Sequence, residues 1–347
     1  MTKKWRISMF LVSSFFLLAA CGKNEQKNSE NQTTIEPKES QVVNDSSNIE
    51  ENEKNQVSFD NYEYDYDVVT SATKTTFGTT PAAKMTYEEK LDKMFWSTQP
   101  PLGLIEGNYY RNERRFDGDY RGIVEVVTDD DSKILHVEFN EFASENYYEP
   151  KYAGKSKRLS DYAFFQAQNT RTDETLVTVV NGITFLEKQM REENRVDGAF
   201  ETVKGSSTSA RNGFMPIAAE MADWIRTPYK SYYYGYAEDF GNGIVGRLQV
   251  TTEDGKIDTV RYDEYFADKK ESISEEKLQS LYRQSKYYSL DYQKISGDNF
   301  VAFSDQLGEE IIKSQNFEQL DESLMQHPSY ENYQKIAKNT LNSIAIC

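Results

Sequence analysis

Alternating apolar and polar positions mark two similar stretches of the chain. Residues 122–142 read GIVEVVTDDDSKILHVEFNEF, and residues 246–265 read GRLQVTTEDGKIDTVRYDEY. In each stretch an alternating run leads into a short acidic segment, and a second alternating run follows. This pattern predicts a β-hairpin with one buried face, because successive side chains of a strand point to opposite faces. The acidic tips are typical of hairpin turns.

The two stretches align position by position, and the first has one extra residue at the tip of its turn. The aligned pairs include Tyr109 and Tyr233, Tyr110 and Tyr234, Phe116 and Phe240, Val124 and Leu248, Val126 and Val250, Val137 and Val260, Phe139 and Tyr262, and Glu141 and Glu264. Internal repeats of this kind indicate a copied unit of structure. The sequence therefore predicts an α+β fold with two tandem copies of a small domain, at residues 85–228 and 229–347.

Helical spacing of apolar residues surrounds both hairpins. It predicts helices over residues 86–96, 159–168, 182–191, 215–225, 275–283 and 301–313, with one or two closing helices within 317–346. A short strand is expected over residues 176–180. The helix after each hairpin is thus also expected twice, which agrees with a duplicated α+β unit.

The first 20 residues have the pattern of an export signal. Three cations precede an apolar run that ends in Leu18-Ala19-Ala20-Cys21. This ending resembles the bacterial lipobox, and the alternative is an ordinary signal peptide with a chance cysteine. The resemblance implies cleavage before Cys21 and diacylglycerol on its sulfur, and two or more acyl chains give stable anchoring. We therefore expect a lipid-anchored protein at the extracellular face of the cell membrane.

Residues 21–84 are polar and low in complexity, which predicts a flexible linker behind the lipidated cysteine. A random coil of this length would span roughly 45 Å, so the folded part could move away from the membrane surface. Aromatic residues occur in this segment at Tyr62, Tyr64 and Tyr66, alternating with acidic residues. A docking strand at these tyrosines is the alternative.

The composition excludes several classes of function. The formal net charge is -17, which disfavours a nucleic-acid partner. Only two cysteines, Cys21 and Cys347, and two histidines, His136 and His327, are present, so no disulfide framework or zinc site is expected. A hydrolytic triad would have to use one of these histidines and is disfavoured.

The lipobox, the polar linker and the order of hairpin, helix, glycine turn and helix together resemble the FMN-binding-domain lipoproteins of Gram-positive bacteria. This group includes the flavinylated lipoproteins of extracellular electron transfer and the pheromone-precursor lipoproteins. Its attachment motif is Ser/Thr-Gly-Ala-Thr/Ser, and the resemblance implies that a flavin transferase esterifies the last hydroxyl to the phosphate of FMN. Here Gly205 matches the glycine, Ser206 stands at the alanine and Ser207 at the modified position. Lys204 replaces the leading hydroxyl residue, and Ser206 and Thr208 are register alternatives.

The second copy contains a related turn, Ser296-Gly297-Asp298-Asn299. Asn299 stands at the modified position and has no hydroxyl, so at most one covalent FMN is expected. The motif has a chemical rationale, because glycine lets the backbone approach a phosphate and the start of a helix presents free N–H groups to an anion. An ordinary Ser-rich loop with a helix cap is the alternative. Candidate ring partners by position are Tyr109, Tyr110 and Phe214.

The resemblance implies a membrane-anchored extracellular flavoprotein that receives electrons from a membrane donor and passes them to external acceptors. Such a protein is a carrier rather than a classical enzyme. A flavin-free surface interaction module is the alternative, which the departures from the motif favour. The resemblance to pheromone precursors also implies that the end of the signal peptide, Phe15–Ala20, could be processed into a secreted peptide.

Overall fold

The computed structural model describes residues 55–59, 62–66, 68–69, 86–92, 94, 97–169, 179–200, 202–203 and 209–341. The signal peptide, Cys21, much of the linker and the Lys204–Thr208 segment lie outside the described residues, as does Cys347.

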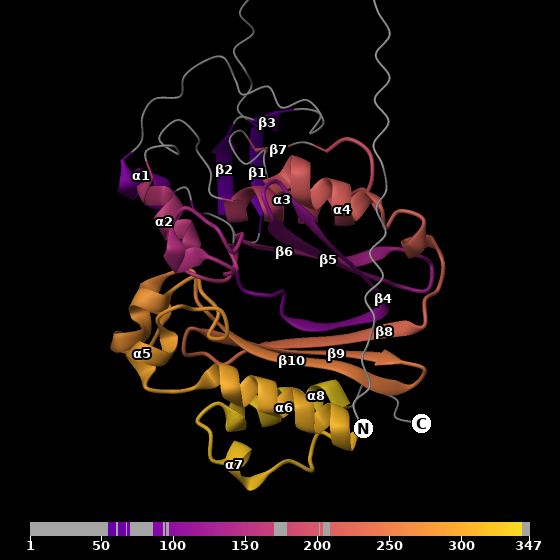
Figure 1. Cartoon of the computed structure of the whole chain (residues 1–347), viewed down its shortest axis with the longest axis vertical. Coiled ribbons are helices and arrows are strands. Elements are labelled where there is room, and N and C mark those ends of the chain that lie inside the picture. Colours follow the sequence, from indigo (N-terminus) through magenta and orange to yellow (C-terminus); the bar gives the residue numbers. More distant parts are fainter. Residues whose placement is uncertain are drawn as a thin grey trace, which may run out of the picture. The chain divides into compact units, whose positions relative to one another are not determined.

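Six strands form one antiparallel sheet in the order β10-β9-β8-β4-β5-β6 (Figure 1). The strands are β4 (Gly103–Phe116), β5 (Tyr120–Thr128), β6 (Ile134–Phe142), β8 (Ser231–Asp239), β9 (Ile244–Glu253) and β10 (Lys256–Phe266). Both predicted hairpins are confirmed, since Val126 pairs with Val137 and Val250 with Val260. The two sequence copies contribute three strands each, and β4 and β8 join them, with Leu104 opposite Tyr236. The domain division at residue 228 stays a prediction, since one sheet crosses it.

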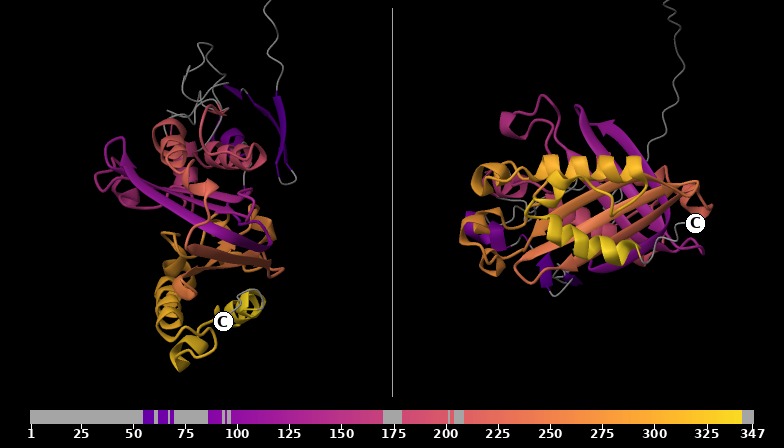
Figure 2. Two further views of the ribbon diagram at one scale, coloured as in Figure 1. Left: turned by 90° about the vertical axis from the view of Figure 1, so that its right-hand side faces the viewer. Right: turned by 90° about the horizontal axis from the view of Figure 1, so that it is seen from below.

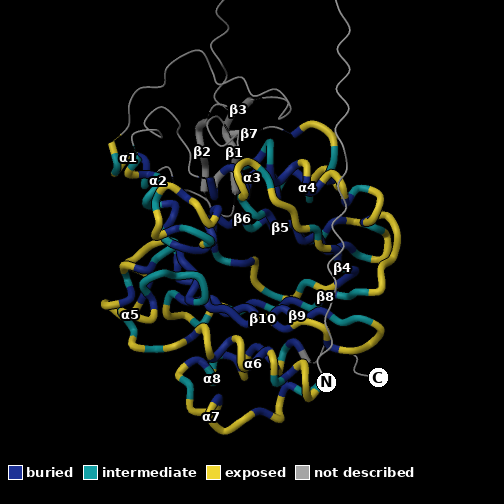
Figure 3. The backbone as a smooth tube through the Cα atoms, in the orientation of Figure 1, coloured by how far each residue is buried: buried dark blue, intermediate teal, exposed yellow. Residues whose placement is uncertain are grey.

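Helices cover the outward faces of both halves of the sheet (Figures 1 and 2). In the first half, α3 (Val179–Glu192) contacts β6, while the π-helical segment η3 (Ser209–Phe214) and α4 (Met215–Ala219) contact β4 and β5. In the second half, α6 (Phe300–Ser314) contacts β10, and α8 (Tyr330–Leu341) contacts β8 and β9. Each helix layer buries its own apolar core against the sheet, as the dark strands of Figure 3 show.

The two halves repeat specific contacts. Phe214 stacks on Phe139 with ring centroids 4.7 Å apart, and Tyr333 contacts Tyr262, the residue aligned with Phe139, at 5.6 Å. Three residues further along each helix, Ile217 packs against Gly122 and Ile336 packs against Gly246. The η3–α4 segment of the first half is therefore equivalent to α8 of the second.

A second pair of equivalent contacts relates α3 to α6. Asn194 follows α3 and accepts a hydrogen bond from Ile134 N at 2.7 Å, and Gln315 follows α6 and accepts one from Ile257 N at 2.7 Å. Both residues have a left-handed backbone, with φ of 51° and 55°. In each half, an amide side chain behind the helix therefore bonds the first residues of the last strand.

Two ion pairs connect the inward faces of the two halves, one fully buried and one with its arginine partly exposed. Arg247 on β9 contacts Glu138 on β6, and Arg261 on β10 contacts Glu125 on β5. At one end, the edges of β6 and β10 are joined through the segments that follow them, where Ser285 N donates to Leu159 O at 3.0 Å. The sheet thus folds over on itself, and its polar face lies inside.

The remaining elements are short. They are η1 (Pro150–Tyr152), η4 (Trp224–Arg226), η5 (Lys270–Ser272), η6 (Glu276–Leu281), α1 (Tyr87–Asp92), α2 (Tyr162–Gln168), α5 (Tyr292–Ser296) and α7 (Glu322–Met325). The closing helices are confirmed as α7 and α8. The helix expected over 275–283 is instead the 3₁₀ helix η6, which ends because Tyr282 is extended and Arg283 is left-handed. The strand expected over 176–180 differs too, since Val179 and Val180 begin α3 and residues 176–178 lie outside the described residues.

Strands occur where the sequence predicts a flexible linker. The hairpin strands β1 (Asn55–Phe59) and β2 (Tyr62–Tyr66) pair with each other, and β3 (Val68–Val69) pairs with β7 (Thr202–Val203). The alternating tyrosines of β2 favour a strand because aromatic residues have high β propensity. The β3–β7 pair also places Val68 beside Val203, the residue directly before Lys204.

Candidate functional site

The predicted attachment residues Lys204, Gly205, Ser206, Ser207 and Thr208 lie outside the described residues, so the structure does not position their side chains. Their flanks are described, because β7 ends at Val203 and the helical segment η3–α4 begins at Ser209.

Tight contacts fix the start of this helical segment against the β4–β5 turn. A Cβ atom at Gly213 would overlap the ring of Phe116, so only glycine fits there. Asn212 Nδ2 donates to Asp117 Oδ2 in the turn itself. The predicted attachment segment therefore leads into a helix start that is packed against the sheet.

The three aromatic residues proposed by position as ring partners are already engaged. Tyr110 is 3% exposed and donates to Thr227 O, and Phe214 is fully buried against Phe139. Tyr109 donates to Glu125 inside the folded sheet and stacks on Tyr233 at 5.8 Å. Tyr110 and Phe214 are packed in the apolar core, and Tyr109 is packed in the polar interior. Their ring faces are therefore not free to contact a flavin, and these residues do not fit that role.

The glycine turn of the second copy has a structural role. Gly297 has φ of 77° and ends α5, while Asn299 caps α6 by accepting from Ala302 N at 3.4 Å. Asp298 accepts from Tyr292 Oη at 2.7 Å and lies 2.6 Å from Nε2 of His327. These contacts fill the turn with internal partners.

This turn is also not the counterpart of Gly205. It precedes α6, which is equivalent to α3, whereas Gly205 precedes the η3–α4 segment, which is equivalent to α8. Ser207 lies seven residues before Phe214, and Gln326 lies seven residues before Tyr333. Gln326 is therefore the residue of the second half that corresponds to Ser207. The two glycine turns therefore resemble each other only locally, and the second half lacks a hydroxyl at both candidate positions.

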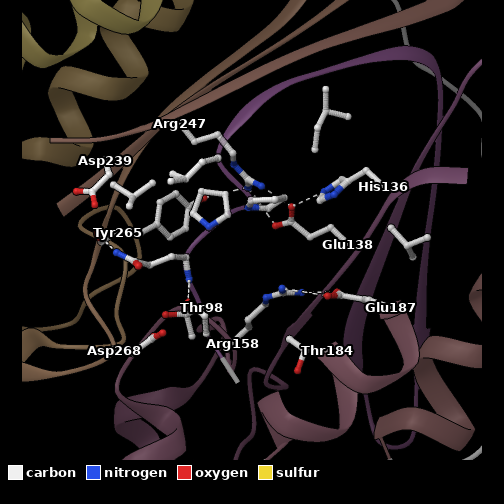
Figure 4. Close-up of a pocket in the computed structure, with 18 of the residues that line it drawn as sticks. Thr98, His136, Glu138, Arg158, Thr184, Glu187, Asp239, Arg247, Tyr265 and Asp268 are labelled. Carbon is white, nitrogen blue, oxygen red and sulfur yellow. Dashed lines mark hydrogen bonds and ion pairs between the residues drawn. The ribbon is translucent and has the colours of Figure 1, made fainter. Parts of the chain in front are cut away.

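A cavity of about 810 Å³ lies between the two halves of the sheet (Figure 4). At its centre, Arg247 Nη1 lies 2.7 Å from Glu138 Oε2 and Nη2 lies 3.1 Å from Oε1. Arg247 Nη2 also donates to Tyr265 Oη at 3.0 Å, and His136 Nε2 lies 3.2 Å from Glu138 Oε2. Strands β6, β9 and β10 thus bring four polar side chains together in the interior.

The central pair is held in its charged form. Burial alone would raise the pKa of Glu138, but the charge of Arg247 and the hydrogen bonds from His136 and Arg247 outweigh it, and the pKa lies well below its usual value. Burial would lower the pKa of Arg247, but Glu138 holds that pKa well above its usual value. Glu138 is therefore a fixed charge and does not suit proton transfer near neutral pH.

A second ion pair forms the wall of the cavity at the edge of β6. Arg158 and Glu187, which lies on α3, contact each other, with Arg158 Nη2 3.2 Å from Glu187 Oε2. Arg158 Nη1 donates to Phe139 O at 2.9 Å, and Phe139 N donates to Glu187 Oε1 at 2.7 Å. This pair satisfies backbone groups that the edge strand leaves free.

A smaller cavity of about 320 Å³ shares Glu138, Arg247 and Tyr265 with the first. Its wall includes Asp263, which accepts from Ser285 Oγ at 2.6 Å and from Tyr287 N at 3.1 Å. Burial raises the pKa of Asp263 to about 7, because these hydrogen bonds and the charge of Arg247 offset only part of the desolvation.

The sequence pattern alone does not predict this polar interior. Glu125, Glu138, Arg247 and Arg261 occupy alternate strand positions that are normally solvent-facing in a two-layer α+β unit. One signal was present, since the first hairpin carries acidic residues at such positions and the second carries arginines. Opposite charges on two copies of one unit are compatible with the copies packing face to face.

Across the described residues, no helix is long and apolar enough to cross a membrane. Within that same part of the chain, no group of three or more His, Cys, Asp or Glu side chains is placed to hold a metal ion. Comparisons of the chain with models of known protein families, with curated proteins and with solved structures found no match.

Proposed function

We propose that the protein is a lipid-anchored extracellular carrier of FMN, with the flavin esterified through its phosphate to Ser207. The carrying observation is the position of the hydroxyl-rich segment Lys204–Thr208, which leads directly into the packed helical segment that begins at Ser209. Free N–H groups at a helix start favour a phosphate, and Lys204 adds a positive charge. The lipid on Cys21 keeps the carrier at the membrane, where it receives electrons from a membrane donor and passes them to an external acceptor.

We propose that each chain carries one covalently attached FMN. Gln326 stands opposite Ser207 in the second half, and Asn299 stands in the second glycine turn. Neither side chain has a hydroxyl that a flavin transferase could esterify. The second half then serves as a partner for the first, through the shared sheet and the ion pairs of the interior.

The ring of the flavin needs partners other than the three named from the sequence. Phe116 packs over Gly213 beside the helix start, and the half-buried Tyr120 lies next to Phe116, with ring centroids 5.9 Å apart. Tyr120 is engaged as well, because Lys157 Nζ lies 3.9 Å from its ring centroid and Tyr147 packs against it at 6.2 Å, so it is not assigned as a ring partner. When bound, FMN supplies the redox chemistry, and the protein positions it and excludes other reactions.

Intact mass tests this function directly. The chain is expressed with a bacterial flavin transferase, and its mass is compared with those of the Ser207→Ala, Ser206→Ala and Thr208→Ala variants. We expect an increase of one FMN less water that only Ser207→Ala abolishes. Ser296→Ala is the matched control, since it changes a hydroxyl in the second glycine turn and should keep the added mass. Loss in Ser206→Ala or Thr208→Ala instead would shift the attachment site by one residue.

A flavin-free surface interaction module is the second candidate. The observation in its favour is that Tyr109, Tyr110 and Phe214 are all engaged in internal packing. A chain that gains no mass and no visible flavin absorbance with an active transferase would support this candidate over the carrier.

A further inference from the structure

We propose that the 810 Å³ cavity between the two halves of the sheet binds a small organic anion with an apolar body, such as an aromatic or aliphatic carboxylate or sulfonate. This inference does not depend on flavin attachment. The cavity combines unpaired cations, unpartnered buried donors and an apolar wall.

Two cations of the wall have no ion-pair partner among the described residues. They are Arg191, near the end of α3, and Lys269, behind β10. The buried acids of the wall are already neutralised, since Glu138 pairs with Arg247 and Glu187 with Arg158.

The wall contains two further acidic residues, Asp268 and Asp239. Asp268 lies 3.9 Å from Arg283, and Asp239 is exposed and accepts from Gly241 N. The wall therefore contains four cations and four acids and is neutral as a whole, and Arg191 and Lys269 are its two cations without an ion-pair partner in the described part of the chain.

Three side chains of the cavity wall have polar atoms without a hydrogen-bond partner, two of them with donor groups and the third being Asp268, whose Oδ1 is an acceptor. Thr98 is 6% exposed and its Oγ1 is unsatisfied, and Arg247 is 7% exposed and its Nε is unsatisfied. Both residues belong to the wall, and Figure 4 labels them there. A buried donor without a partner costs about 1–3 kcal/mol. Because Arg247 Nε can only donate, an oxygen-rich acceptor satisfies it, and a carboxylate or sulfonate supplies such oxygens.

The rest of the wall is apolar. It includes Pro101, Leu102, Ile105, Leu135 and Val245. The volume of the cavity falls within the range of about 300–1,000 Å³ that is typical of small-molecule sites. An inorganic anion alone would leave the apolar side of this volume in contact with water, so the geometry favours an anion that carries an apolar group.

The neighbouring smaller cavity provides an internal contrast. Its wall includes Asp263, Asp305 and Glu309, none of which has an ion-pair partner among the described residues. The same anion should therefore be repelled there. Selectivity for the larger cavity follows from charge as well as from size.

The test uses the chain from Gly22 to Cys347 without flavin, which retains every residue that the structure describes. The probes are 8-anilinonaphthalene-1-sulfonate, which fluoresces in apolar sites, and its uncharged parent N-phenyl-1-naphthylamine. Fluorescence titration gives the affinity and the number of sites for the wild-type chain and for the Arg191→Gln and Leu102→Glu variants. Lys294→Gln and Leu104→Glu are the matched controls, because Lys294 and Leu104 are exposed and lie outside the cavity wall.

We expect one saturable site for the sulfonate and weaker binding of the uncharged parent. Arg191→Gln and Leu102→Glu should each weaken sulfonate binding about tenfold, since each changes the charge balance at the site by one unit. The two controls should leave it within about twofold. Circular dichroism of all variants checks that the fold is kept, which is expected because neither Arg191 nor the exposed Leu102 makes a described polar contact. Equal binding of the two probes, or equal affinity in the cavity and control variants, would overturn the proposal.

Discussion

Arg247 and Glu138 form a buried ion pair between strands that are not neighbours in the sheet. Nη1 of Arg247 on β9 lies 2.7 Å from Oε2 of Glu138 on β6, and β8, β4 and β5 separate these strands in the sheet order. The pair can form only because the sheet folds over on itself. Arg261 and Glu125 repeat this arrangement between β10 and β5. The polar interior therefore determines how the two halves meet.

Removing one partner of the central pair should destabilise the protein strongly. Arg247→Met leaves Glu138 buried without its cation, and the free energy of unfolding should fall by about 3–5 kcal/mol. Adding Glu138→Leu should recover most of that loss, because an apolar pair needs no charge compensation. Urea unfolding of the two single variants and the double variant measures the coupling.

An exposed ion pair serves as the control for this cycle. Arg114 and Glu220 contact each other on the surface, with side chains 52% and 41% exposed. Arg114→Met should change the free energy of unfolding by no more than about 1 kcal/mol. If Arg247→Met were as mild as Arg114→Met, the central pair would not hold the two halves together.

The hairpins could be predicted from the sequence because alternation identifies a strand with two different faces. Alternation does not say what covers the polar face. In this fold that face packs against its own copy, so residues such as Glu125 and Arg247 are inside although their pattern suggests solvent. The burial of the polar face becomes visible only in contacts between the two halves, such as the one between Arg261 and Glu125, which are 136 positions apart in the sequence.

The equivalence of the two glycine turns could not be judged from the sequence. Gly205 and Gly297 each precede a helix and follow a hairpin, so local order makes them look alike. The contacts of Phe214 with Phe139 and of Tyr333 with Tyr262 show that the helices behind these turns belong to different positions of the unit. Short turn motifs carry little positional information, whereas core contacts set the alignment of the two halves.

Asp263 should make stability depend on pH. Its pKa is about 7 in the folded protein, against an ordinary value of 3.8, because its burial outweighs its hydrogen bonds and the charge of Arg247. The folded state then binds the proton more tightly than the unfolded state. The contribution of Asp263 to the free energy of unfolding should therefore be largest below about pH 4. It should fall by up to about 4 kcal/mol as the pH rises to 7.

Asp263→Asn isolates this contribution. The aligned residue in the first half is Asn140, which bonds Ser156 Oγ at 2.7 Å as Asp263 bonds Ser285 Oγ. The amide should therefore fit, and the variant should be more stable than the wild type above pH 7 and lose the slope between pH 4 and 7. Asn140→Asp is the matched reverse change and should create a similar slope. Denaturant unfolding of both variants at several pH values between 4 and 7 measures this slope. If the stability of Asp263→Asn still fell as the pH rises from 4 to 7, the prediction would be contradicted.

The amide residues behind α3 and α6 should have similar energetic roles. Asn194→Ala and Gln315→Ala each remove the acceptor for an N–H group at the start of a strand, Ile134 in β6 and Ile257 in β10, and place alanine at a left-handed position. Each should lower the free energy of unfolding by about 2–3 kcal/mol, from the unpaired N–H group and the backbone strain. Asn194→Gly and Gln315→Gly keep the backbone relaxed and should cost less. Thermal unfolding of the four variants distinguishes the two contributions, and a large cost at only one site would argue against their equivalence.

Gly122 and Gly246 allow the η3–α4 segment and α8 to approach the sheet closely. A Cβ atom at Gly122 would lie 2.7 Å from Cδ1 of Ile217, and one at Gly246 would lie 2.6 Å from Cδ1 of Ile336. Gly122→Ala and Gly246→Ala should therefore each destabilise the protein by about 1–3 kcal/mol through overpacking. Adding Ile217→Val to the first and Ile336→Val to the second removes the nearest methyl group and should return part of the loss. Urea unfolding provides the measurement, and alanine variants as stable as the wild type would show that neither helix is pressed against its glycine.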